Sequence, residues 1–170
     1  MNRIEKIRLP IIHAQVGNKI IGPFYTTAEA SRHFGLNVEA AATSIKSNRK
    51  IRNIKFFTDG IKEFIFNEPN VVEAKREGLM LRATNFNPHN ESSLLHNLKI
   101  CGFENPIILK FDGVKSTVQV DCCNVECDEI VNKRNYNHLT QTTHFLAPRC
   151  EKCKGLYKAY SALNRESKAV

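Results

Sequence analysis

The sequence predicts an α+β protein in two parts, and three observations lead to this expectation. A capped pair of short helices lies in the first third of the chain. Alternating apolar runs interrupted by Asp-Gly pairs predict β-hairpins. Five of the six cysteines lie between residues 122 and 153. We therefore expect a helix-turn-helix module with a β-hairpin wing over 1–84, a linker over 85–97, and a β-rich zinc-ribbon domain with a C-terminal helix over 98–170.

Length and composition exclude membrane and secreted proteins. The chain has 170 residues, of which 42% are hydrophobic, which suits one compact domain or two small ones. No apolar run approaches the roughly 20 residues that span a bilayer. The first fifteen residues scatter charges through their only apolar stretch, so we expect no signal peptide and no membrane partner. A cytoplasmic location follows, in which cysteines remain reduced.

The net charge of +8 is unevenly distributed. Residues 1–66 carry +6, residues 67–121 carry −1, and residues 122–170 carry +3. The densest run lies between residues 46 and 55 and contains no acidic residue: Lys46, Arg49, Lys50, Arg52 and Lys55. A basic stripe of this kind is typical of phosphate binding, and the alternative is a solvated face.

A helix-turn-helix pattern precedes this basic run. Thr26 and Glu29 form a capping box that starts a short helix. Gly35 suits the left-handed end of that helix, and Asn37 is a good N-cap for a second one. In the second helix we expect an inward stripe of Val38, Ala41 or Ala42, and Ile45, with Glu39, Thr43, Lys46 and Ser47 facing outward.

Such a pair reads DNA by placing its second helix in the major groove. The outward side chains would then meet base edges, and the residues after the helix would meet phosphates. The expected DNA-binding residues are Thr43, Lys46, Ser47, Asn48, Arg49, Lys50, Arg52 and Lys55. The alternative is a pair of helices that packs a core and binds nothing.

Strand signals surround the helices and recur later in the chain. A hairpin is expected at Gly17-Asn18, and another at Asp59-Gly60, where it would form a wing beside the helices. A short helix over 71–83 would break at Gly78. A further hairpin is expected at Asp112-Gly113, and a helix over 155–168 closes the chain.

The cysteines form the strongest site in the sequence. Cys150 and Cys153 have the spacing of a metal knuckle, and Cys127 with Cys122 would supply the other two thiolates. Four sulfurs satisfy tetrahedral Zn²⁺ and give one structural site. Strand alternation favours Cys122 as the fourth ligand, whereas a tighter loop favours Cys123. His138 or His144 could replace one sulfur, and buried thiols, disulfides or a catalytic thiol are the other interpretations.

Two segments resemble modules of phage homing endonucleases. Residues 24–57, with Phe34-Gly35-Leu36 followed by SIKSNRKIRNIKFF, resemble their modular helix-turn-helix domains. Residues 118–155, with Asn137-His138-Leu139 and the closing Cys150-x-x-Cys153-Lys154, resemble their zinc ribbon, although four residues rather than two separate the first ligand pair. The resemblance implies double-stranded DNA as the partner and, for a phage gene, a location inside the host cell.

An HNH nuclease would also end in Cys-x-x-Cys, and its residues are incomplete here. The weak catalytic candidates are His138 and His144, but Asn137 stands where an Asp or His is usual, and Lys154 stands where a His is usual. We therefore expect a repressor-like, sequence-specific transcriptional regulator. The alternatives are a nuclease that cuts DNA with a divalent metal, and a zinc-ribbon adaptor for a protein or RNA. A protein partner or a homodimer is left open.

Overall fold

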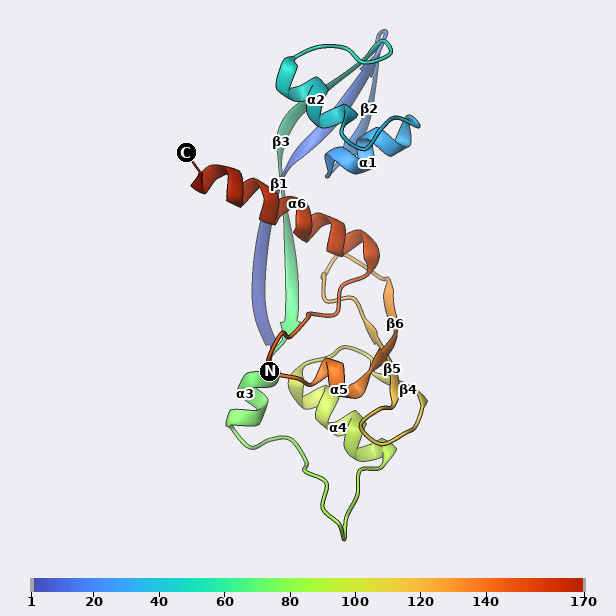
Figure 1. Ribbon diagram of the computed structural model, residues 1–170, viewed down its shortest axis with the longest axis vertical. Coiled ribbons are helices and arrows are strands. Elements are labelled where there is room, and N and C mark those ends of the chain that lie inside the picture. The colour runs from blue at the N-terminus through green and yellow to red at the C-terminus, as the bar shows by residue number, and fades with distance from the viewer. Residues whose placement is uncertain (1, 170) are drawn as a thin grey trace. The chain divides into compact units, whose positions relative to one another are not determined.

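The computed structural model describes residues 2–169 and confirms the α+β class (Figure 1). Two small sheets have the strand orders β2-β1-β3 and β4-β5-β6. The chain forms two compact units. We call Ile7–Glu63 with Lys154–Val170 the basic unit, and Met1–Lys6 with Phe64–Cys153 the cysteine unit.

The boundaries of these units differ from the expected ones, because three elements run from one unit into the other along the chain. These elements are β1 (Asn2–Val16), β3 (Ile54–Pro69) and α6 (Glu151–Lys168). The charge divides with the units. The basic unit has 13 Lys and Arg against five Asp and Glu, and the cysteine unit has 12 of each. The whole net charge of +8 therefore belongs to the basic unit.

The basic unit begins with the predicted hairpin of β1 and β2 (Lys19–Phe24), which turns at Gly17-Asn18. α1 (Thr27–His33) and α2 (Ala40–Ser47) follow. Seven buried side chains from the strands and helices form the core of this unit: Ile12, Ala14, Phe24, Ala30, Ala41, Ile54 and Phe56. The helices are thus fixed to the sheet by apolar contact.

The helix pair confirms Thr26 as the N-cap of α1 and corrects the inward stripe of α2. The expected reciprocal bond is displaced by one residue, because the Glu29 carboxylate accepts from the Tyr25 N–H at 3.2 Å and not from the Thr26 N–H. The Thr26 hydroxyl accepts a hydrogen bond from the Glu29 N–H at 3.0 Å, and Gly35 has a φ of 62°. The buried residues of α2 are Ala40, Ala41 and Ser44, whereas Val38 is 50% exposed and Ile45 is partly buried. The helix begins two residues later than expected, because Val38 and Glu39 form a turn after Asn37 and the Asn37 side chain caps that turn.

The predicted wing at Asp59-Gly60 is wrong. These residues lie inside β3, which continues from Ile54 to Pro69 without reversing. β3 pairs with β1, which is itself 15 residues long, so the two halves of β3 do not fold back to pair with each other. Gly60 keeps the positive φ of 85° that its sequence context favours, but within a strand.

The cysteine unit contains the remaining elements. α3 (Val71–Arg76) stops before Gly78, as predicted, and β4 (Ile107–Lys110) pairs antiparallel with β5 (Thr117–Asp121) around Asp112-Gly113. β6 (Ile130–Asn135) and the short α5 (Tyr136–Leu139) complete the unit. None of the helices within residues 2–169 combines the length and apolar character that a bilayer span requires.

The expected linker over 85–97 is partly helical. α4 spans Glu91–Cys101 and starts with reciprocal hydrogen bonds between Asn90 and Ser93. Leu94 and Leu98 on this helix are fully buried. The Asn and Ser residues that indicate a loop therefore cap a helix here.

Candidate functional site

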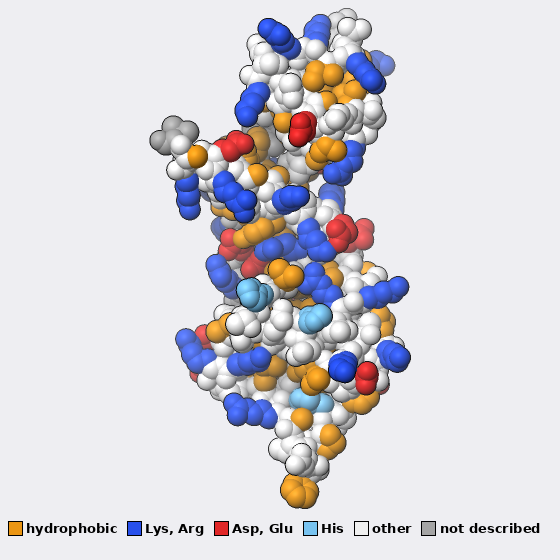
Figure 2. Space-filling model, in the orientation of Figure 1, with side chains coloured by type: hydrophobic (Ala, Val, Ile, Leu, Met, Phe, Trp, Pro, Cys, Tyr) orange, Lys and Arg blue, Asp and Glu red, His pale blue; other side chains and the backbone are white. Residues whose placement is uncertain are grey.

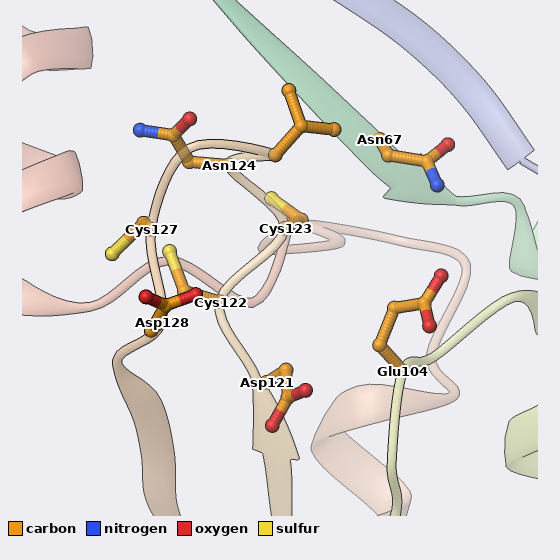
Figure 3. Close-up of a pocket in the computed structure, with 9 residues that line it drawn as sticks. Asn67, Glu104, Asp121, Cys122, Cys123, Asn124, Cys127 and Asp128 are labelled. Atoms are coloured by element: carbon orange, nitrogen blue, oxygen red, sulfur yellow. The ribbon is translucent and has the colours of Figure 1, made fainter.

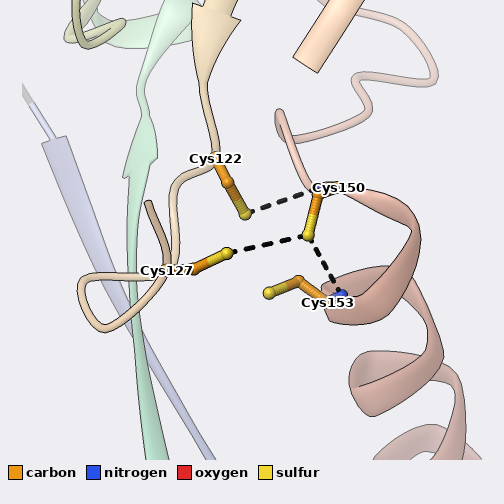
Figure 4. Close-up of side chains that lie close together, drawn as sticks. All are labelled: Cys122, Cys127, Cys150 and Cys153. Carbon is orange, nitrogen blue, oxygen red and sulfur yellow. Dashed lines mark hydrogen bonds between the residues drawn. The ribbon is translucent and has the colours of Figure 1, made fainter. Parts of the chain in front are cut away.

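Four cysteine sulfurs converge in the cysteine unit (Figure 4). The Sγ atoms of Cys122, Cys127, Cys150 and Cys153 all lie within 4.8 Å of one another. The Cys127 and Cys150 sulfurs are 3.7 Å apart. Four sulfurs at these separations can share one metal ion, so the set named from the sequence forms a candidate metal centre.

The first ligand pair is positioned by the end of β5. Val118 and Val120 are buried, and alternation carries the Cys122 side chain to the same face. A tight turn then returns the chain, with the Cys127 N–H donating to the Asn124 carbonyl at 3.0 Å. The turn therefore brings Cys127 back beside Cys122 after a gap of four residues.

The second pair is positioned by the start of α6. Cys150 directly precedes the helix, and Cys153 lies in its first turn. The Cys153 N–H donates to the Cys150 sulfur at 3.5 Å, and the Cys150 N–H donates to the Cys122 sulfur at 3.4 Å. The Asn124 side-chain amide donates to the Cys153 sulfur at 3.2 Å. These N–H groups and the positive end of the helix dipole stabilise thiolates.

Hydrogen bonding within the cluster lowers the pKa of the Cys122 thiol to about 5. The largest cause is the hydrogen bond from the Cys153 thiol, and backbone N–H groups add to it, while burial opposes it. The same hydrogen bond raises the pKa of Cys153. Cys122 is therefore a thiolate at neutral pH, the form that binds metal.

Cys123 lies outside the cluster, although it is adjacent to Cys122. Figure 3 shows its sulfur apart from those of Cys122 and Cys127. Burial raises the pKa of Cys123 to about 12, which makes it a protonated core thiol. Cys101 is also buried and has a pKa raised to about 11 by burial. Strand alternation, rather than loop length, thus identified the cysteine that joins the cluster.

The two histidines that could have replaced a sulfur are exposed. His138 lies on α5, and His144 lies in the loop before α6 with a φ of 55°. Within residues 2–169, the group of metal-ligating side chains close enough to share an ion consists of the four cysteines.

A cavity of about 400 Å³ borders the sulfur cluster (Figure 3). Cys122 and Cys127 contribute to its lining, together with three carboxylate side chains: Glu104, Asp121 and Asp128. Negative charge along an open cavity raises the local concentration of cations. The cavity therefore places three carboxylates beside two of the four clustered cysteines.

The predicted DNA-binding residues lie together at one end of α2 and the segment that follows it. We call residues 46–55 the basic segment. Seven of the eight predicted side chains are exposed, and Lys55 on β3 is partly buried. No ion pair described within residues 2–169 involves a Lys or Arg of this segment. Lys and Arg side chains lie over the part of Figure 2 that contains α1 and α2, with few acidic ones among them.

One buried hydroxyl binds the backbone at Arg49, within the basic segment, and at Phe56, directly after it, and sequence reasoning missed this hydroxyl. The Ser44 Oγ atom donates to the Arg49 carbonyl at 2.6 Å and accepts from the Phe56 N–H at 3.2 Å. Ser31 similarly accepts from the Ala41 N–H at 2.9 Å and joins the two helices. A serine inside an alanine-rich helix is a weak signal, because only its burial gives it this role.

Comparison of the chain with protein-family models, curated proteins and solved structures finds no match in any of the three.

Proposed function

We propose that the protein binds double-stranded DNA through α2 and the basic segment. The observation that carries this proposal is the concentration of charge. The basic unit holds the entire net charge of +8. In its densest run, four of the five cationic side chains are exposed, Lys55 is partly buried, and no ion pair described within residues 2–169 involves any of them. Phosphate contacts from such a surface supply most of the affinity for DNA.

In this proposal, α2 lies in the major groove. Its exposed face presents Thr43, Lys46 and Ser47, which can hydrogen-bond base edges. Asn48, Arg49 and Lys50 then follow the phosphate backbone. The Ser44 hydrogen bonds hold this segment in place before DNA arrives, which lowers the entropy lost on binding.

We further propose that the candidate metal centre holds one structural Zn²⁺. Four thiolates match the preference of zinc for sulfur and fill a tetrahedral shell, so no position remains for substrate. The resemblance to homing-endonuclease modules supports the same assignment. A regulatory role is supported by Asn137 and Lys154, which stand where an HNH nuclease usually has an Asp or His and a His. In this role a phage or mobile-element protein occupies a DNA site and represses transcription without cutting it.

The salt dependence of duplex affinity tests the proposed function. If about six phosphates are contacted, log affinity should fall against log salt with a slope near −5. The double variant Arg49→Gln/Lys50→Gln removes two proposed phosphate contacts, so it should weaken binding and reduce the slope by about 2. The matched control is Lys110→Gln/Lys115→Gln, which removes two exposed lysines of the cysteine unit and should leave the slope unchanged.

Three results would contradict the proposal. A slope near zero excludes duplex DNA as the partner, and equal effects of the two double variants exclude the basic segment as the contact. Tighter binding of RNA than of duplex DNA would favour the adaptor function. Incubation with DNA and Mg²⁺ or Mn²⁺ tests the nuclease, since cutting that disappears in His138→Ala would support it.

A further inference from the structure

A tight two-residue turn projects from the basic segment. Ile51 and Ile54 exchange two backbone hydrogen bonds, both 2.9 Å long. The residues between them, Arg52 and Asn53, have φ values of 46° and 63°. Two central residues with positive φ are characteristic of a type I′ turn. Arg52 and Asn53 are both exposed and therefore form the tip.

The positive φ of Arg52 costs conformational free energy, and the contacts on both sides of the turn maintain it. Positive φ values are uncommon for residues other than glycine, with Asn more tolerant than Arg. Ile54 is buried in the core and fixes one side of the turn. The Ser44 hydroxyl binds the backbone on both sides of the turn, at Arg49 and at Phe56. Strained backbone that its surroundings hold in place is most often found at functional sites.

We propose that this turn inserts Arg52 into the minor groove of A·T-rich DNA, next to the major groove that α2 occupies. The inference rests on the proposed function and adds a second, groove-specific contact to it. A type I′ turn is a narrow tip, and the minor groove is only about 6 Å wide. A narrow A·T minor groove has an enhanced negative potential, which attracts an Arg guanidinium.

The chain between α2 and the turn has a suitable length for this arrangement. α2 ends at Ser47, and the four residues 48–51 lead to the tip. Four residues span at most about 14 Å, and the left-handed Asn48 (φ 54°) shortens this reach, so the tip lies no farther from the end of α2 than about the 12 Å width of the major groove. Arg49 and Lys50 lie on this crossing segment, where phosphates would face them. Along the chain, the proposed phosphate contacts Arg49 and Lys50 therefore come before Arg52, the proposed contact in the minor groove.

Three duplexes of equal length test the inference: alternating A·T, alternating I·C and alternating G·C. An I·C pair has the major-groove pattern of G·C but lacks the N2 amino group in the minor groove. A minor-groove contact therefore predicts that the protein binds the A·T and I·C duplexes about five-fold or more tighter than the G·C duplex. Arg52→Asn should remove this preference, because Asn accepts the positive φ but lacks the guanidinium.

Matched variants separate the groove contact from general charge loss. Lys50→Gln should weaken binding to all three duplexes equally and reduce the salt slope by about 0.9, while the preference remains. Arg52→Gly also suits the turn and should lose the preference even if Arg52→Asn fails to fold. Thermal melting checks that each variant is folded.

The outcomes distinguish this inference from the proposed function. If the wild-type protein binds no duplex, the proposed function fails and the inference fails with it. If it binds all three duplexes equally, or if Arg52→Asn and Arg52→Gly keep the preference, only the minor-groove contact is overturned. A preference of A·T over both I·C and G·C would place the discrimination in the major groove and would also overturn it.

Discussion

If the four clustered cysteines hold one structural zinc ion, as proposed, its removal should unfold the cysteine unit, and the reactivity of the cysteines should report this unfolding. A structural zinc site of four thiolates contributes about 10 kcal/mol or more to folding at neutral pH. A domain of this size is stable by only about 5–15 kcal/mol in total. Loss of the ion therefore removes most or all of the stability of the unit.

The two thiols outside the cluster serve as sensors of this unfolding. In the folded protein, burial raises the pKa of Cys101 to about 11 and that of Cys123 to about 12, from an ordinary value of 9.0. At neutral pH, the thiolate fraction of each is then about a hundredfold and a thousandfold lower than that of an ordinary cysteine. Both should react very slowly with a thiol reagent until the unit unfolds.

The assay follows the number of reactive thiols over time. In the zinc-loaded protein, none of the six cysteines should react quickly, because four are bound to metal and two are buried. Excess chelator should make all six reactive and release one zinc per chain, whereas chelator already saturated with zinc should have no effect. Release of zinc with only four reactive thiols would refute the reasoning, because the unit would then be folded without its metal.

Two other predictions concern single residues. Ser44→Ala should lower the free energy of unfolding by about 1–3 kcal/mol, because the Arg49 carbonyl and the Phe56 N–H lose their hydrogen-bond partner. As a control, Ser47→Ala on the exposed face of α2 should change the free energy of unfolding by less than about 0.5 kcal/mol. Chemical denaturation measures both, and equal effects would contradict the role of Ser44. Because the folded state raises the pKa of Cys101, its contribution to stability is full below pH 9 and is lost as pH rises to about 11. Denaturation of the zinc-loaded protein between pH 9 and 11 should show a falling free energy of unfolding, and this fall should be smaller in Cys101→Ala. An equal fall in the variant and the wild-type protein would contradict the contribution assigned to Cys101.

The features that could be predicted from the sequence depend on neighbours in the chain. The Thr26 cap, the turn at Gly35 and the hairpin at Gly17-Asn18 need only a few consecutive residues to specify them. Cys122 could be predicted as a member of the cysteine cluster for a similar reason, since alternation along β5 fixes which face its side chain occupies. The Cys150 and Cys153 pair is set by one turn of helix.

The features that could not be predicted depend on distant partners. Asp59-Gly60 carries the local signal of a turn, but pairing with the long β1 keeps it inside a strand. Asn90 and Ser93 carry the local signal of a loop, but the burial of Leu94 and Leu98 extends a helix from them. The hydrogen bond between the Ser44 hydroxyl and the Phe56 N–H joins α2 to a residue twelve positions away, and no local sequence pattern predicts such a contact.

The interleaved path of the chain has a practical consequence for dissecting the protein. The basic unit comprises two separate stretches, and the second one begins at Lys154, immediately after the clustered Cys153. A fragment that stops at Glu63 would therefore lack part of the basic unit, and no single cut isolates either unit intact. The first turn of α6 contains the candidate ligand Cys153, and the helix continues into the basic unit, so any unwinding of that turn on loss of a metal ion would start within an element that both units share.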